Sequence, residues 1–265
     1  MRAGVILASA LLALAAVPGP GVAAPPAKWP SAAEVRAVTP GLAAKDASCI
    51  ARYYRGRLSR KAWLTAYYKL TRAEKTVTDA GFTRCMTLER RAALTEHEDA
   101  LSFGEHPAAL RCSSHREAAR SEAFLLSITS LAEAIRAGDR IYRACRVTGA
   151  LYAALGKASM LEITPAEQAC TNRIGSVDPL RNRGTAPTIA QRTAVGTVFD
   201  RCVGQVSKQA FLGRLFKDFR PKGAIPCVVK HATSITFVTL YSDSAGVQRL
   251  AKAAGAACRL GPATK

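Results

Sequence analysis

The chain has 265 residues, and its 38 lysines and arginines against 19 acids give a formal net charge of +19. A charge of this size keeps a protein soluble and attracts anions, which favours an anionic over a cationic partner. Beyond residue 24 the most apolar run covers only residues 235–241. Crossing a bilayer takes roughly 20 apolar residues, so we expect no integral membrane span in that part of the chain.

Residues 1–24 have the three parts of a secretory signal peptide. A basic start at Arg2 precedes an apolar run over residues 5–17, and small residues follow a Pro-Gly-Pro break. Such segments direct export and are removed after a small residue. We expect cleavage after Ala23 or Ala24 and a secreted or periplasmic protein, with an uncleaved membrane anchor as the alternative. Residues 25–39 are rich in proline and alanine, which predicts a linker.

Residues 40–102 predict a first helical unit. Serine and threonine residues stand where N-caps are expected, before stretches in which apolar side chains recur at helical spacing. The predicted helices cover residues 49–54, 60–70 and 72–85, with Ser59 and Thr71 as caps of the second and third.

Residues 103–160 predict a second unit. Pro107 suits the first turn of a helix, where no backbone N–H donor is needed. Apolar residues on one helical face predict a single helix over residues 121–137. Gly138 is expected to end that helix and Asp139 to cap the next one.

Residues 161–220 and 221–265 predict the third and fourth units. Thr164 followed by Pro165 is an N-cap with a first-turn proline. In the third unit we expect a loop over 175–187 in place of a middle helix, followed by a helix from Thr188 into Cys202. In the fourth unit we expect a β-branched stretch over 234–241 and a last helix into Cys258. Connecting helices are predicted at 86–101, 146–160 and 206–219.

The eight cysteines indicate how these elements are organised. The gaps between them are 36, 27, 33, 25, 32, 25 and 31 residues, so long and short alternate. In each predicted unit one cysteine lies in the first helix and one near the end of the last, and those ends are neighbours in an antiparallel hairpin. Disulfides need Cα atoms within about 4.4–6.8 Å. We predict the bridges Cys49–Cys85, Cys112–Cys145, Cys170–Cys202 and Cys227–Cys258.

The expected fold is therefore all-α: four tandem, disulfide-stapled helical-hairpin units of two or three helices each, packed as a short solenoid-like array. An even number of cysteines after a signal peptide favours an oxidising compartment.

No metal site, cofactor or catalytic residue is predicted. The cysteines form no Cys-x-x-Cys pair and no Cys/His zinc spacing. Acids and histidines gather between Glu96 and His115, but Leu101 breaks the His-Glu-x-x-His pattern, and we interpret the stretch as a polar loop. The chain has no Gly-x-Ser-x-Gly motif and no glycine-rich phosphate loop.

The most concentrated candidate surface lies between residues 52 and 69. Cations alternate there with aromatic residues, and the stretch contains no acid. Such a mixture suits phosphate contact with stacking, or the surface of a membrane; the alternative is that the aromatic residues face the core. The candidate binding residues are Arg52, Tyr53, Arg55, Arg57, Arg60, Lys61, Trp63 and Lys69.

A second pattern is a base three residues after the first cysteine of each unit. These bases are Arg52, His115, Arg173 and Lys230. If the units stack, the bases would form a column that could hold a polyanion, while a solvated helix position is the simpler interpretation.

The sequence thus predicts a non-enzymatic binding or scaffold protein whose basic surface meets an anionic partner: an envelope polymer, lipid head groups or nucleic acid. One alternative is a helical repeat array that binds proteins or small molecules and whose charge is incidental. Another is an envelope enzyme with a site that the sequence does not reveal.

Overall fold

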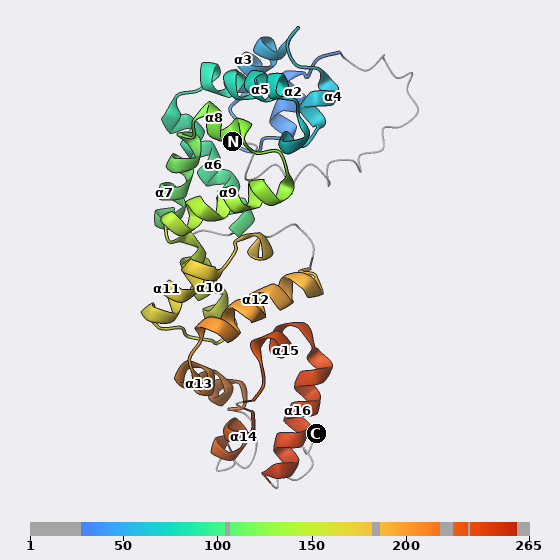
Figure 1. The fold of residues 1–265 in the computed structure, drawn as a ribbon. Helices are drawn as coiled ribbons and strands as arrows, with labels where there is room; N and C mark the ends of the chain where they lie inside the picture. Colours follow the sequence, from blue (N-terminus) through green and yellow to red (C-terminus); the bar gives the residue numbers. More distant parts are fainter. Residues whose placement is uncertain (1–27, 104–106, 182–185, 218–224, 233, 259–265) are drawn as a thin grey trace, which may run out of the picture. The chain divides into compact units, whose positions relative to one another are not determined.

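The computed structural model describes residues 28–103, 107–181, 186–217, 225–232 and 234–258, and within these ranges it is all-helical (Figure 1). The chain divides into two compact parts, Met1–Cys145 and Arg146–Lys265. We call them the N-terminal unit and the C-terminal unit. Each has its own hydrophobic core. The predicted signal peptide lies outside the described residues.

No described helix combines the length and the apolar character needed to cross a membrane.

In the N-terminal unit, α2 packs on α3, α3 on α5, and α6 on α7. The core is built around Tyr54 and Trp63, whose ring centres lie 5.3 Å apart. The elements are α2 (Ala32–Ala37), α3 (Ala44–Tyr54), α4 (Arg60–Leu64), the 3₁₀ turn η1 (Tyr67–Lys69), α5 (Arg72–Cys85), α6 (Leu88–Phe103), α7 (Pro107–Ala118), α8 (Glu122–Leu126) and α9 (Leu131–Ala144). Within the predicted linker, α2 buries Val35 and begins at a capping box of Ser31 and Glu34.

In the C-terminal unit, α10 packs on α11, α12 on α15, and α14 on α16. Its core surrounds Phe199, which is fully buried. The elements are α10 (Val147–Ala158), α11 (Pro165–Ile174), the 3₁₀ turn η2 (Asp178–Leu180), α12 (Ile189–Cys202), α13 (Gln205–Leu215), α14 (Ile225–Ala232), α15 (Phe237–Ser242) and α16 (Ser244–Ala257).

Four predicted helix starts are confirmed, and each has a side-chain cap. The side chains of Ser59, Thr71, Thr164 and Thr188 each accept a hydrogen bond from the backbone N–H three residues on. In three of these cases a Glu or Gln at that position closes a capping box, so two backbone N–H donors at the helix start are satisfied.

The predicted helix over residues 60–70 is wrong, because α4 ends at Leu64. The backbone at Thr65 is extended, and the chain resumes as the single 3₁₀ turn η1. The break lets Trp63 and Tyr67 both enter the core, where the Tyr67 hydroxyl donates to Asp79 at 2.5 Å. Leu64 is left exposed.

The predicted helix over residues 121–137 is also wrong, because it is broken between α8 and α9. The carbonyl of Ile128 accepts a 2.6 Å hydrogen bond from the buried Nζ of Lys75, which an unbroken helix would keep for its own ladder. Ser130 and Glu133 then cap a new helix. Gly138 does not end it and Asp139 caps nothing, since both lie inside α9.

Four disulfides connect the cysteines: Cys49–Cys85, Cys112–Cys145, Cys170–Cys202 and Cys227–Cys258, with Cα separations of 5.4–5.8 Å. They are the pairs that the alternating gaps predict. In each, the first cysteine lies within α3, α7, α11 or α14, and the second lies at the end of α5, α9, α12 or α16. Two bridges fall in each compact unit.

A peptide map made without reduction is expected to recover these four cross-linked pairs and to leave no free thiol. Each bridge closes a loop of about 31–36 residues, for which the chain-entropy model gives roughly 3.7 kcal/mol of stabilisation. Mild reduction should therefore lower the unfolding temperature of both units. A peptide joining Cys85 to Cys112 would show that the bridges run between the predicted units instead.

Glu167 connects two helix starts of the C-terminal unit. It closes the capping box of α11 and accepts from the backbone N–H of Gly204 at 2.6 Å and from the Ser207 hydroxyl at 2.8 Å, at the start of α13. Burial alone would raise the pKa of Glu167. The hydrogen bonds from Thr164, Gly204 and Ser207 outweigh burial and hold this pKa below its usual value of 4.5.

We expect Glu167→Gln to destabilise the C-terminal unit by about 1–2 kcal/mol at neutral pH. Because the pKa is lowered in the folded state, the stabilisation by Glu167 is present above pH 4.5 and is lost as the pH falls through the folded-state pKa. Acid titration of the unfolding free energy should therefore be flatter in the variant than in the wild type. Glu162→Gln, at an exposed acid whose pair with Arg214 is 3.5 Å long, is the control and should leave the unfolding free energy at neutral pH within about 0.5 kcal/mol of wild type.

Candidate functional site

The basic segment, Arg52–Lys69, covers the end of α3, all of α4 and η1. Most of its cations are exposed to solvent. The exposed ones are Arg52, Arg55, Arg57, Lys61 and Lys69. Gly56, between two of them, has a φ of +78°, a left-handed conformation that lets the chain turn sharply after α3. Together α3, the tight turn, α4 and η1 thus hold five cations on the surface of the N-terminal unit.

The aromatic residues of the basic segment divide into two groups. Tyr54, Trp63 and Tyr67 are buried at 0–1% exposure and belong to the core. Tyr53 and Tyr68 are half-buried, and each is covered by a cation: Arg57 lies 4.9 Å from the ring centre of Tyr53, and Lys69 lies 5.8 Å from that of Tyr68. The predicted role of Trp63 at a binding surface is therefore not supported by its position.

Arg60 is occupied within the protein, because its guanidinium forms an ion pair with Glu34 of α2. Its backbone N–H also donates to the carbonyl of Lys28 at 3.1 Å. This contact places the segment around Lys28, which precedes α2, alongside α4. Lys28 is exposed and lies 5.1 Å from the ring centre of Trp29, so it adds a cation and a half-buried aromatic ring to the surface around α4.

The four bases after the first cysteines are all exposed, and each lies in the last turn of its helix. Arg52 belongs to α3, His115 to α7, Arg173 to α11 and Lys230 to α14. A cation there is favoured by the partial negative charge of the helix C-terminus. Their recurrence thus has a local electrostatic explanation, whether or not the bases form a column.

The predicted polar loop after Glu96 is wrong, because residues 96–103 continue α6. Glu98 and Asp99 are buried there, and Asp99 accepts a 2.7 Å hydrogen bond from the Tyr142 hydroxyl of α9. Among the described residues, one group has the spacing of a metal site: Cys227, His231 and Cys258. Its two sulfurs are joined in a disulfide, so they offer no thiolate to a metal.

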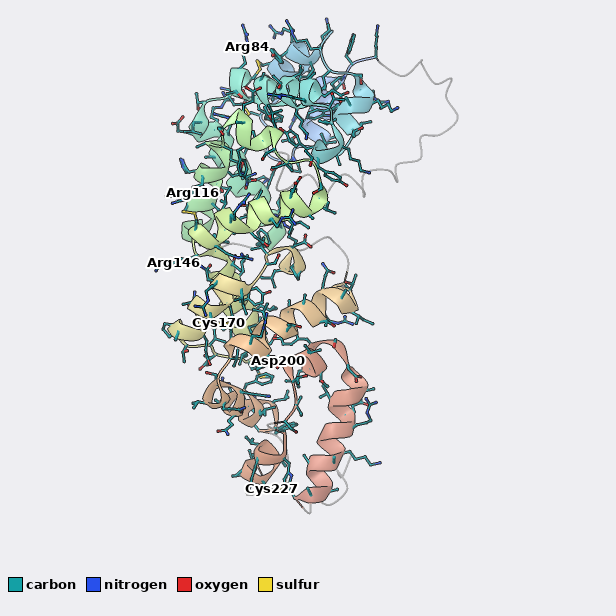
Figure 2. All side chains as sticks on the ribbon, viewed as in Figure 1. Arg84, Arg116, Arg146, Cys170, Asp200 and Cys227 are labelled. Atoms are coloured by element: carbon teal, nitrogen blue, oxygen red, sulfur yellow. A yellow bond between two sulfur atoms is a disulfide. The ribbon has the colours of Figure 1, made fainter. Side chains whose placement is uncertain are left out.

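Acids of the described residues are used mainly as internal acceptors. Four glutamates close capping boxes, and Asp243 caps α16. Asp200 accepts from the backbone N–H groups of Phe237 and Val238, at 2.6 and 3.1 Å, and so joins α12 to α15 (Figure 2). The other acids in ion pairs or hydrogen bonds with side chains include Asp46 with Arg90, Glu117 with Arg120, Asp79 with Tyr67, and Asp99 with Tyr142.

Among the exposed residues, the excess of basic over acidic side chains is therefore larger than in the composition of the whole chain. The exposed acids among the described residues are Glu89, Glu122, Glu162 and Asp200. Exposed lysines and arginines outnumber them several-fold, and examples such as Arg84 and Arg116 lie at the periphery of the N-terminal unit (Figure 2). Few carboxylates remain on the surface to neutralise these cations locally.

The structure also contains a cavity that the sequence analysis missed. It lies in the N-terminal unit between α5, α6, α7 and α8 and has a volume of about 550 Å³. Glu117 and Arg120 lie in its wall, but their side chains are only 0% and 4% exposed and form a buried ion pair of 3.2 Å. No sequence pattern indicates this cavity, because two polar residues at the end of α7 resemble an ordinary helix terminus.

Comparison with known proteins gives no relative: no family model, no curated protein and no solved structure matches this chain.

Proposed function

We propose that this is an exported, non-enzymatic binding protein that holds an anionic partner on the basic surface of its N-terminal unit. The observation that supports this most is the use of the acids. Caps, ion pairs and buried hydrogen bonds occupy them, while the cations of the basic segment face solvent. A surface with uncompensated charge raises the local concentration of an oppositely charged partner.

The burial of aromatic residues in the basic segment limits which classes of partner this surface can bind. Nucleic-acid binding by stacking needs exposed rings, and insertion at a membrane surface needs exposed tryptophan or tyrosine. Tyr54, Trp63 and Tyr67 are in the core and serve neither purpose. What remains is charge contact from arginine and lysine, with Tyr53 and Tyr68 beside it. These contacts favour an anionic envelope polymer over a base-stacked nucleic acid or an inserted bilayer.

Export is proposed from two independent features. Residues 1–24 have the pattern that is typical of secretory signal peptides, and the four disulfides are consistent with an oxidising compartment. We propose that the mature protein is secreted or periplasmic.

The tandem architecture is also proposed, on the recurrence of one helix order. Helices α5, α9, α12 and α16 each have 14 residues, each starts at a side-chain cap, and each ends at or next to the second cysteine of a pair. A shorter element precedes each of them. Four such units, with approximate bounds 40–102, 103–160, 161–220 and 221–265, would bury their faces on neighbours in a solenoid-like array.

Binding to a panel of anionic probes tests the proposed function. The panel contains lipopolysaccharide, teichoic acid, anionic lipid vesicles and double-stranded DNA. The basic-segment variant replaces five exposed cations with glutamine: Arg52, Arg55, Arg57, Lys61 and Lys69. The control replaces five other exposed bases of the same unit: Arg72, Arg111, Arg116, Arg136 and Arg140.

Both variants lose the same formal charge. We expect the basic-segment variant to bind the polymers about tenfold more weakly or worse, while the control stays close to wild type. Equal losses in the two variants would mean that net charge alone matters and that the charge is incidental. Preferred binding to vesicles or DNA would contradict the choice of an envelope polymer.

A further inference from the structure

One of the four disulfides has an imidazole beside its sulfurs. The ring of His231 offers a nitrogen within 4.8 Å of both sulfurs of the Cys227–Cys258 bridge. Cys227 and His231 stand four residues apart on α14, so one turn of helix places them on the same face. Cys258 comes from the end of α16, which packs on α14 (Figure 1). The imidazole is exposed and the two cysteines are half-buried, so a dissolved thiol can reach the bridge.

The other three bridges do not have this arrangement. Four residues after the first cysteine of a pair they have Tyr53, Arg116 and Ile174, where the fourth pair has His231. His115 follows its cysteine at three residues, but it belongs to no such group of ring nitrogen and sulfurs among the described residues. An imidazole differs from these other side chains because it takes up and releases a proton between about pH 5 and 8. Of the four described bridges, Cys227–Cys258 is therefore the one with a proton carrier beside it.

The first cysteine of this pair also has a different place in its helix. In α3, α7 and α11 the cysteine is the sixth residue of the helix, whereas Cys227 is the third residue of α14. The N–H groups of a first helical turn have no partner within the helix and give that end a partial positive charge. A thiolate is favoured both there and beside an imidazolium. Cys258 lies at the opposite, partially negative end of its own helix, so a negative charge is better placed on Cys227.

We propose that Cys227–Cys258 is a thiol–disulfide exchange site, which accepts two electrons from a dithiol such as the reduced cysteine pair of a redox protein. The other three bridges stay closed under the same conditions. A thiolate opens a disulfide faster when the sulfur that leaves is the better-stabilised thiolate. The start of α14 and the ring of His231 both stabilise Cys227 in that role. The incoming thiolate is therefore expected to attack the sulfur of Cys258.

The exchange takes two steps. In the first, a thiol of the dithiol gives its proton to water and attacks Cys258. The bond between Cys258 and Cys227 breaks, Cys227 leaves as a thiolate, and His231 gives it a proton that water then replaces. In the second step, the other thiol of the dithiol loses its proton and attacks the partner sulfur of the mixed disulfide. Cys258 leaves and is protonated by water, so the dithiol is oxidised to a disulfide and the bridge is reduced to two thiols.

This proposal does not depend on the proposed function. The bridge belongs to the C-terminal unit, whereas the basic segment belongs to the N-terminal unit. One dithiol reacts with one bridge, so the exchange is stoichiometric and needs no anionic partner. Loss of polyanion binding and loss of exchange can therefore be observed separately.

Partial reduction of the folded protein with dithiothreitol tests the proposal. Samples are quenched with acid, alkylated and mapped as peptides, so that each bridge is followed by itself. We expect Cys227–Cys258 to open about tenfold faster than the other bridges. Cys170–Cys202 is the internal reference, because it lies in the same unit and reports any general opening of that unit. Equal rates for these two bridges, or earlier opening of another bridge, would overturn the proposal.

Replacing the imidazole separates its chemistry from simple accessibility. His231→Gln is expected to slow the opening of Cys227–Cys258 about tenfold, and added free imidazole should restore part of the rate. Its equilibrium with glutathione should move about tenfold toward the disulfide, which corresponds to about 30 mV. The unfolding temperature of the oxidised protein should not change, since His231 is exposed.

His115→Gln is the matched control, since it removes an exposed imidazole that follows the first cysteine of another pair. It should leave the opening rates of all four bridges unchanged. If His231→Gln opens as fast as wild type, His231 has no part in the exchange and the proposal fails. Slower opening that comes with a higher unfolding temperature would also refute it, because the stability of the unit would then control the rate.

Discussion

Replacing Phe199 with alanine is expected to destabilise the C-terminal unit by about 3–5 kcal/mol. Phe199 is fully buried in α12, and its ring centre lies 5.5–5.7 Å from the rings of Tyr152, Phe237 and Tyr241. Removing it takes away the shared contact of α10, α12 and α15 and leaves a cavity that packed aromatic rings cannot close. Phe199→Leu retains most of the volume and should cost less than about 1.5 kcal/mol.

The positions of the two tryptophans allow the unfolding of the two units to be followed separately. Trp29 and Trp63 both lie in the N-terminal unit. Tryptophan fluorescence therefore reports on that unit, while far-ultraviolet circular dichroism reports on the helices of both. Because each unit has its own core, we expect Phe199→Ala to shift the dichroism transition and to leave the fluorescence transition in place. A shift below about 1 kcal/mol would contradict the central position of Phe199 in this core.

Gly81→Ala is the second large effect, and it concerns the N-terminal unit. A Cβ atom at position 81 would lie 2.4 Å from Cε1 of Tyr54. The Tyr54 ring has no room to move, since it is fully buried beside Trp63 and its hydroxyl donates to the Thr78 carbonyl at 3.0 Å. Overpacking of this kind costs about 1–3 kcal/mol or more.

Gly138→Ala is the matched control, because Gly138 also lies inside a 14-residue helix of the same unit. Its nearest neighbour would be the Tyr142 ring at 3.7 Å, an ordinary contact. Alanine there should stabilise the helix by about 0.5–1 kcal/mol. Denaturant unfolding followed by tryptophan fluorescence should therefore move in opposite directions for the two variants. A neutral Gly81→Ala would mean that α3 and α5 are not packed as closely as described.

Local signals predicted much of this fold because they act over a few residues. The capping threonines before α5, α11 and α12 fix helix starts through hydrogen bonds to the next turn, so they are visible in the sequence. The alternating cysteine gaps likewise carry long-range information, since each pair must come within bonding distance. These two signals together give the all-helical fold and the same four cysteine pairs.

Contacts between distant residues account for the errors. The apolar pattern over residues 121–137 predicts one helix, but Lys75, 53 residues away from Ile128, takes the carbonyl that such a helix needs. Arg60 pairs with Glu34, which lies 26 residues earlier, so the sequence pattern made Arg60 resemble a free surface cation. Periodicity describes one face of one helix and does not contain these partners.

The same reasoning explains why the cavity was missed and the basic segment was only half understood. Glu117 and Arg120 look like an ordinary polar helix end until α5 and α8 enclose them. In the basic segment, the alternation of cations and aromatic residues does not say which ring is buried. Packing decides that Tyr54, Trp63 and Tyr67 face the core and that the neighbouring cations face solvent.

The salt dependence of binding tests the central claim most directly. When charge contacts hold a polyanion, counterions are released on binding, so the logarithm of the affinity falls linearly with the logarithm of the salt concentration, and the slope grows with the number of contacts. With teichoic acid as the probe, we expect the wild-type affinity to fall steeply with salt. The slope of the control variant, which lacks five exposed bases outside the basic segment, should be similar. The slope of the basic-segment variant should be clearly shallower. Identical slopes in all three proteins would contradict a binding surface on the basic segment.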